Sequence, residues 1–248
     1  MARKLEHAYK IHTLQLATMA VEKSLRTIWQ GFGETITDDP VQFFYIEGPE
    51  ERILVDVGGA ADEINEFWPG TKDIQSFEDA LGSVGLKPED IDIILLSHMC
   101  FDHVLNARKC PNARVYIQEK ELEYTLNPPA LFRGTIPFSA LRDLRFVPVQ
   151  GDQEIVPGVN VIFLPGHTPG TQGVTVETKD GLAVITGFCC TEENFTDCPE
   201  PLKDIWNNMV PIGYASHPLD AFNSMIRVKG LADIIIPQHG RKIPDVIG

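Results

Sequence analysis

Four side chains that could bind a metal lie close together in the middle of the chain. They are His98, Cys100, Asp102 and His103, and they follow the apolar run at residues 91–96. Imidazole, thiolate and carboxylate groups are the usual protein ligands of zinc and other transition metals. In α/β folds, functional residues commonly lie just past the end of a strand. This spacing therefore predicts a metal site at the end of a buried strand.

Two later histidines follow apolar runs in the same way. His167 lies in a Pro-Gly-His-Thr-Pro-Gly turn after residues 159–164, and His239 lies in a Pro-Gln-His-Gly turn after residues 232–236. Proline fixes φ and glycine allows backbone conformations that other residues rarely adopt, so such turns are well defined and each histidine is expected in a defined place. A single histidine is more often a hydrogen-bonded structural residue than a ligand. Four of the seven histidines at strand exits, joined by Asp102, favour one common metal centre.

These motifs together resemble the metallo-β-lactamase superfamily, and within it the N-acyl homoserine lactonase-like branch. The first motif, the turn around His167 and the late His239 carry the resemblance. Residues 43–47 and 53–59 are similar to the opening strands of that family and to its aspartate turn, where Asp56 stands. The resemblance runs from about residue 43 to residue 239, which is most of the chain.

The resemblance implies two adjacent metal positions, each held by three side chains. The first would be formed by His98, Cys100 and His167, and the second by Asp102, His103 and His239. Two imidazoles and a thiolate form a soft site that suits zinc or iron, and two imidazoles with a carboxylate also suit ferrous iron. We expect one or two zinc ions, with iron as the alternative metal.

Two departures from the family pattern fall on this site. Cys100 stands where the family has the second histidine of its first motif. After residues 182–186 the bridging aspartate of the family is missing from the Gly-Phe-Cys-Cys segment, and Cys190 stands where the lactonase branch has a tyrosine. The thiolate of Cys189 or Cys190 could replace the bridging carboxylate. Because the two cysteines are adjacent, one should face the site and the other the core. The candidate ligands therefore include Cys189, and the candidate catalytic residues are Asp102, His103 and Cys190.

The chemistry predicted from these residues is hydrolysis of a small carbonyl compound. A lactone is the first choice, and an ester, a thioester or a cyclic amide are the others. A metal-bound hydroxide would attack the carbonyl carbon, and Asp102 could pass the proton to the leaving alkoxide. Two alternatives stay open: an iron-dependent redox enzyme on the same fold, and a binding protein with a decayed site.

The elements that must position these residues are short. Apolar runs predict strands at residues 43–46, 52–57, 91–96, 114–117, 159–164, 173–177, 182–185 and 233–236, and helices at 76–84, 119–126 and 219–229. Ser76 is expected to cap the first of these helices. Such a pattern indicates an α/β or α+β fold, and the resemblance makes it an αββα sandwich with the site at one edge. We expect residues 1–248 to form one domain.

Composition limits the partners of the protein. A net charge of −14 disfavours binding to nucleic acid, which depends on lysine and arginine. No apolar run approaches the ~20 residues that span a bilayer. Five cysteines and a polar N-terminus indicate a reducing compartment without a disulfide framework. We therefore expect a cytoplasmic protein with a small-molecule substrate and no nucleic-acid or membrane partner, and family precedent allows for a homodimer.

Overall fold

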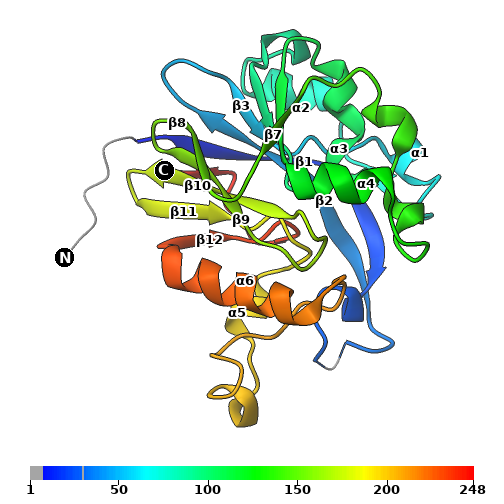
Figure 1. The fold of residues 1–248 in the computed structure, drawn as a ribbon, viewed down its shortest axis with the longest axis vertical. Coiled ribbons are helices and arrows are strands. Elements are labelled where there is room, and N and C mark those ends of the chain that lie inside the picture. The colour runs from blue at the N-terminus through cyan, green and yellow to red at the C-terminus, as the bar shows by residue number, and fades with distance from the viewer. Residues whose placement is uncertain (1–7, 30) are drawn as a thin grey trace.

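Two β-sheets lie face to face, and helices cover both outer faces (Figure 1). The computed structural model describes residues 8–29 and 31–248. The larger sheet has the strand order β13-β1-β2-β3-β5-β6-β7, with β4 paired to β1, and the smaller has the order β12-β11-β10-β9-β8. This arrangement confirms the αββα sandwich of the metallo-β-lactamase type.

The larger sheet combines an antiparallel half with a parallel half. Its strands are β1 (Lys10–Glu22), β2 (Thr35–Glu47), β3 (Ile53–Val55), β4 (Lys72–Asp73), β5 (Ile93–Leu95), β6 (Arg114–Gln118), β7 (Phe146–Val149) and β13 (Val246–Ile247). The pairs from β1 to β3 are antiparallel, whereas β3, β5, β6 and β7 are parallel. The parallel register places Val55 beside Leu95, so the loops after β3 and β5 begin side by side.

The smaller sheet is antiparallel except at one edge. Its strands are β8 (Gln153–Val156), β9 (Val159–Phe163), β10 (Gln172–Thr178), β11 (Gly181–Ile185) and β12 (Ile234–Ile236). The α-helices are α1 (Ala61–Ile64), α2 (Phe77–Ser83), α3 (Phe101–Val104), α4 (Glu119–Leu126), α5 (Glu193–Thr196) and α6 (Pro218–Leu231). Strands β11 and β12 run parallel, with Ile185 beside Ile236, so their exits also meet.

Alternation along the buried strands separates three layers of the core. Ile53 and Val55 point between the two sheets, whereas Leu54 points to the helices that cover the larger sheet. In the smaller sheet Ile185 joins the core between the sheets, and Val184 packs on the side of α6. Successive side chains on a strand face opposite sides, so strands buried on both faces need apolar residues throughout. This explains the continuous apolar runs in the sequence.

The predicted strands and helices all have counterparts, but the prediction missed several strands. Strands β1, β4, β7, β8 and β13 were not predicted, and β2 begins at Thr35 rather than near Phe43. Ser76 caps α2 as expected, because its hydroxyl accepts a hydrogen bond from the Asp79 backbone N–H at 3.0 Å. In the described part of the chain no helix is both long and apolar enough to cross a membrane. One domain over residues 1–248 stays a prediction.

Candidate metal centre

Five loops that leave strands meet at one edge of the sandwich. They follow β3, β5, β9, β11 and β12, and they carry Asp56, the 98–103 segment, His167, Cys189 and His239. Two groups of three potential ligands result, with the ligand atoms of each group within 4.8 Å of one another. They are His98, Cys100 and His167, and Asp102, His103 and His239. These are the same two groups of residues that the family resemblance implied as ligands.

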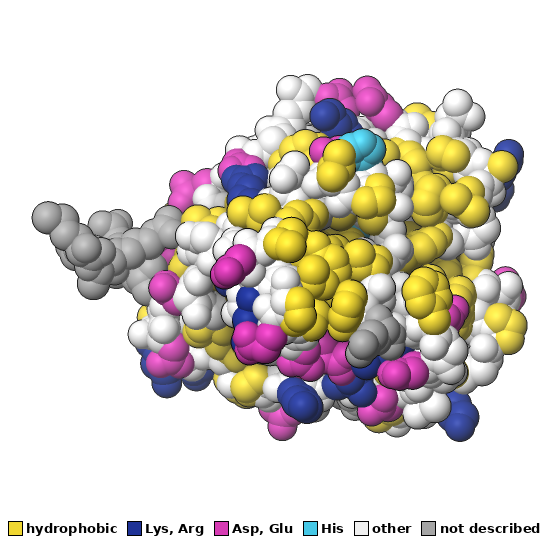
Figure 2. Space-filling model, turned by 90° about the horizontal axis from the view of Figure 1, so that it is seen from below, with side chains coloured by type: hydrophobic (Ala, Val, Ile, Leu, Met, Phe, Trp, Pro, Cys, Tyr) yellow, Lys and Arg dark blue, Asp and Glu magenta, His cyan; other side chains and the backbone are white. Residues whose placement is uncertain are grey.

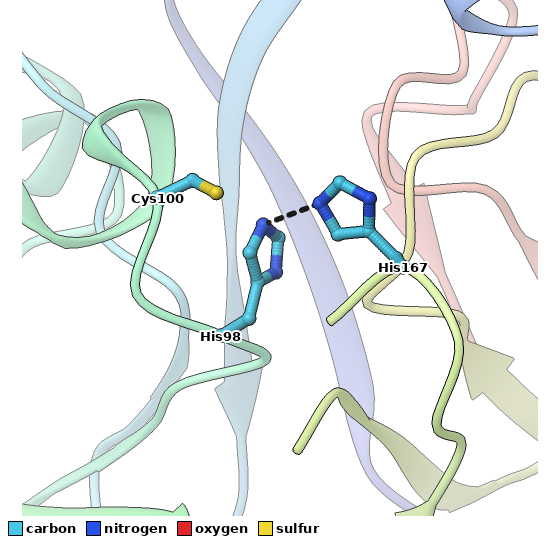
Figure 3. A group of neighbouring side chains, drawn as sticks. All are labelled: His98, Cys100 and His167. Atoms are coloured by element: carbon cyan, nitrogen blue, oxygen red, sulfur yellow. Dashed lines mark hydrogen bonds between the residues drawn. The ribbon is translucent and has the colours of Figure 1, made fainter. Parts of the chain in front are cut away.

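The first group points its donor atoms at one small volume (Figure 3). His98 and His167 come from different sheets, and their Nε2 atoms lie 3.1 Å apart, while the Cys100 thiol points toward the same place. Two nitrogens bound tetrahedrally to one zinc ion lie roughly 3.3 Å apart. A side chain at position 166 would force the His167 turn away from α6, because a Cβ there would lie 2.1 Å from the Ala221 nitrogen.

The hydrogen bonds of these two imidazoles leave both Nε2 atoms without a proton. His167 Nδ1 lies 2.8 Å from the Tyr214 carbonyl oxygen, which can only accept, so Nδ1 carries the hydrogen. Ser97 Oγ donates its one hydrogen to the Asp56 carboxylate, so it must accept from His98 Nδ1 at 2.9 Å. Burial lowers the pKa of His98 well below its ordinary value and that of His167 to about 4, so neither is an imidazolium.

Two facing lone pairs at this distance repel each other unless a cation lies between them. Because the Nε2 atoms of His98 and His167 have this arrangement, the residues present fit a metal ion. Cys100 completes the set: burial, and then the nearby Asp102, raise the pKa of its thiol well above the ordinary value. A coordinated thiol is deprotonated outright, so binding of a cation would release the proton of Cys100.

The second group is held by carboxylates. His103 Nδ1 lies 2.8 Å from Asp56 Oδ2, and its Nε2 lies 3.4 Å from Asp102 Oδ2. Burial lowers the pKa of His103, but Asp102 and Asp56 on either side raise it to about 10 in the protein alone. Asp56 has the left-handed φ of 56° and also accepts from the Ser97 N–H and hydroxyl. A partner of this kind fixes the orientation of a ligating histidine.

A buried arginine lies beside the second group. The Arg26 guanidinium forms a two-point ion pair with Asp39, with Nε 2.9 Å from Oδ1, and it donates to the Cys189 thiol. Its Nη2 lies 3.3 Å from His239 Nδ1. Burial raises the pKa of Asp39, but Arg26 and then His239 lower it to about 2, so the pair is fully ionised. The sequence analysis did not identify either residue.

The two adjacent cysteines face opposite sides, as predicted. Cys189 lines the same cavity as the two ligand groups. Cys190 points into the core under α6, where its sulfur lies 3.2 Å from the Thr186 hydroxyl. Burial raises the pKa of Cys190 to about 12, so it is a neutral core thiol. The structure therefore does not bring Cys190 to the site, and its proposed catalytic role was wrong.

The ligand groups form the floor of a cavity of about 110 Å³. Its walls are mainly apolar, with a few polar side chains. They are Met19, Val21, Leu25, Arg26, Trp68, Phe101, Thr135, Cys189 and Tyr214. An apolar pocket with a few converging polar groups is typical of a small-molecule site. Met19 and Val21 lie in β1, and Leu25 and Arg26 follow soon after it, so a strand that the sequence analysis did not predict contributes much of the wall.

Hydrophobic side chains also gather on the outer surface near this site. Figure 2 shows them on the face that looks down in Figure 1, where α5, α6 and the segment after β1 lie. Ile28, Phe32 and Ile205 are among the exposed large apolar residues, and Trp29 packs edge-on against Trp206 at 5.8 Å. Patches of this kind commonly mark a binding face.

Comparison with known proteins agrees with this geometry. A sequence model of the metallo-beta-lactamase superfamily matches residues 36–187. An N-acyl homoserine lactonase of Bacillus cereus is 32% identical over 172 residues, which is 64% of this chain and 67% of that protein. The lactonase AttM of Rhizobium radiobacter is 24% identical over 90% of this chain and 89% of its own length.

Solved structures show the same fold. A quorum-quenching N-acyl homoserine lactone lactonase superposes with a TM-score of 0.76 and 25% identity, over 96% of this chain and 95% of that one. The dizinc lactonase AidC superposes with a TM-score of 0.68 and 17% identity, over 98% and 92%. The chain therefore belongs to the metallo-beta-lactamase superfamily and is a metal-dependent hydrolase.

Proposed function

We propose that this protein hydrolyses a small lactone, with one zinc ion held by His98, Cys100 and His167. The observation that carries the proposal is the pair of unprotonated Nε2 atoms at 3.1 Å, on the floor of an apolar cavity that also contains Asp102. The homology to lactonases supports the choice of substrate class. When bound, a zinc ion would supply Lewis-acid chemistry, because it makes a bound water more acidic and polarises a carbonyl oxygen.

Asp102 is the residue that we assign to proton transfer. Burial raises its pKa, but His103 and then His239 hold that pKa well below its ordinary value, so the carboxylate is ionised at neutral pH. It can accept the proton of the attacking water and return it to the ring oxygen as the lactone opens. The alkoxide of a lactone stays attached to the acyl group, so both proton positions lie within one site. His103 and His239 keep this carboxylate in place.

The cavity favours compact substrates. Its apolar walls would exclude water around the reacting carbonyl, and its volume of about 110 Å³ suits a compact ring. We expect lactones with short substituents to react faster than those with long acyl chains. Trp68 and Phe101 on the walls would contact the ring of such a substrate.

The test is a comparison of lactones with open-chain substrates on zinc-loaded protein. Acid release would be followed with γ-butyrolactone, N-butyryl- and N-decanoyl-homoserine lactone, an aryl ester and a thioester. We expect the short lactones to be turned over fastest, and chelator treatment to abolish the reaction. His98→Ala should be inactive, whereas His12→Ala should keep full activity, since His12 on β1 pairs with Glu47 on β2 and neither residue lines the cavity. Lactone turnover no faster than that of His98→Ala would refute the proposal.

The identity of the metal separates this proposal from the redox alternative. The ligand sets suit zinc and also iron. Elemental analysis of anaerobically purified protein should give zinc as the main metal. Stoichiometric iron, with turnover that depends on oxygen, would favour the redox enzyme instead.

A further inference from the structure

Arg26 is placed where its charge acts on the second ligand group. Its backbone carbonyl accepts a hydrogen bond from Asn194 at 2.9 Å, and the two-point pair with Asp39 fixes the guanidinium plane. Arg26 and Cys189 both line the cavity, whereas Asp39 lies behind Arg26 and is fully buried. The positive end of the ion pair therefore faces the metal site.

The side chains of the cavity balance one divalent cation but not two. Among the described side chains that line it, Cys100, Asp102 and Cys189 are the acidic ones, apart from the phenol of Tyr214. The Cys100 thiolate and Asp102 together neutralise one doubly charged ion. A second ion would depend on Cys189, and Arg26 already donates to that sulfur.

His239 is engaged in the same way. Its Nδ1 lies 3.3 Å from Arg26 Nη2, 3.3 Å from the Pro40 carbonyl oxygen and 3.4 Å from Asp39 Oδ2. A cation on its Nε2 would therefore lie across one imidazole ring from a fixed guanidinium. Like charges at such a separation repel strongly in a buried site.

We propose that the Arg26 guanidinium, anchored by Asp39 and in contact with Cys189, takes the place of a second metal ion. One cation is then bound tightly by His98, Cys100 and His167, and a second binds only weakly at Asp102, His103 and His239. Arg26 acts here as a positioning residue: it holds a positive charge beside the second group and keeps the Cys189 thiol in place. This proposal rests on the metal site of the proposed function, but not on the choice of a lactone as substrate.

The first test is the zinc stoichiometry of the wild-type protein. Chelator-treated protein would be titrated with zinc by calorimetry against a competing chelator. We expect one tight equivalent and a second step weaker by roughly 100-fold or more. Two equivalents of similar affinity would overturn the proposal. Activity is not needed for this measurement: one tight zinc without lactone hydrolysis would refute the proposed function alone, and hydrolysis with two tight zinc ions would refute this proposal alone.

The second test removes the charge of Arg26. Loss of Arg26 alone would leave Asp39 buried without a partner, so Arg26→Met is combined with Asp39→Asn. We expect this variant to bind the second zinc at least about 10-fold more tightly. Arg26→Lys keeps the charge and should keep the weak second step, and Arg241→Gln, at an exposed ion pair, serves as the control. A folded double variant with an unchanged second step would contradict the proposal.

Cobalt(II) provides a spectroscopic test that does not depend on these variants. A thiolate bound to cobalt gives a charge-transfer absorption band. We expect the first equivalent of cobalt to give this band in wild-type protein and in Cys189→Ser, but not in Cys100→Ser. Loss of the band at the first equivalent in Cys189→Ser would show that Cys189 binds the tight ion, and the role of Arg26 would then be wrong.

Discussion

The two ligand groups share one cavity but are held in place by different kinds of partner. In the first, His98 and His167 are oriented by the Ser97 hydroxyl and the Tyr214 carbonyl, both of which are neutral. In the second, the imidazoles lie among Asp56, Asp39 and Arg26, all of them buried and ionisable. In the first group the lone pairs of the two Nε2 atoms are therefore free to bind a cation. The second group already lies among charged side chains of the protein.

This difference has an energetic basis. Buried ions are strongly destabilising unless they are paired, so Arg26 and Asp39 must remain paired with each other in the folded protein. A cation that enters beside them has to compete with an ion pair that is already complete. Beside the first group, by contrast, a cation removes the repulsion between two lone pairs. We infer that this asymmetry, rather than the count of ligands, decides where a metal binds most tightly.

The largest expected effect comes from removing one histidine from each group. His167→Ala should lose the tight zinc and reduce hydrolysis to the level of the metal-free protein, because it removes a ligand of the first group. His239→Ala should keep one zinc per chain, although hydrolysis should fall as Asp102 loses a neighbour. Metal analysis after gel filtration measures both variants. Equal loss of zinc from the two variants would show that the groups are equivalent and that our comparison fails.

Smaller effects are expected from the residues that orient the imidazoles. Asp56 accepts three hydrogen bonds through two oxygens, from the Ser97 N–H and hydroxyl and from His103 Nδ1. Asparagine tolerates the positive φ of 56° but has only one acceptor oxygen. Ser97→Ala removes only the partner of His98. Both variants should bind zinc about 10–100-fold more weakly, as is usual for such partners.

The pair of variants also distinguishes the two groups. Ser97→Ala should weaken binding of the tight zinc ion and leave binding of the second ion unchanged. Asp56→Asn should weaken binding of both, because Asp56 contacts His103 directly and His98 through Ser97. Zinc titration of both variants, with Ser83→Ala as a surface control, provides the measurement. A tight step that is unaffected in Ser97→Ala would contradict the tautomer that we assign to His98.

The six candidate ligands could be placed at strand exits because their signals are local, whereas the sandwich fold was predicted through the family resemblance. Each ligand follows an apolar strand within a few residues, and the type of residue and the spacing are visible in the sequence. Because the two cysteines are adjacent, the sequence also predicted that they face opposite sides, but it did not show which of them faces the site. Cys190, expected to be catalytic, lies in the core.

The charged surroundings of the second group could not be predicted in this way. Arg26 reaches His239 across 213 positions of sequence, and no spacing links it to Asp39. The long strand β1 was hidden for a related reason: its pairing with β2 shifts register between Gln15 and Ala17 and again between Met19 and Val21. Each shift breaks the alternation of apolar and polar residues, and that alternation is the signal by which a strand is identified.

The last and smallest predicted effect concerns Glu121, a buried residue in α4 that links the two loops carrying the first ligand group. It accepts a hydrogen bond from the Met99 N–H at 3.1 Å, in the loop of His98, and one from the Thr168 hydroxyl at 2.6 Å, in the loop of His167. Burial raises the pKa of this carboxyl from 4.5 to about 7, although Thr168 and two backbone N–H groups oppose the shift. The Glu121 carboxyl that links the two loops would thus be uncharged at mildly acidic pH.

The pH dependence of stability tests this assignment. Between pH 4.5 and about 7 the folded protein keeps a proton on Glu121 that the unfolded chain releases, so this residue makes stability fall as the pH rises through that window. Glu121→Gln removes the effect, and the free energy of unfolding of the wild type should therefore decline relative to the variant by about 1–3 kcal/mol from pH 5 to pH 8. Urea unfolding of metal-free protein measures it, with Glu123→Gln on the exposed side of α4 as the control. If the difference in free energy of unfolding between the wild type and Glu121→Gln does not change with pH, Glu121 is charged throughout. The first group would then lie beside a buried charge, just as the second does.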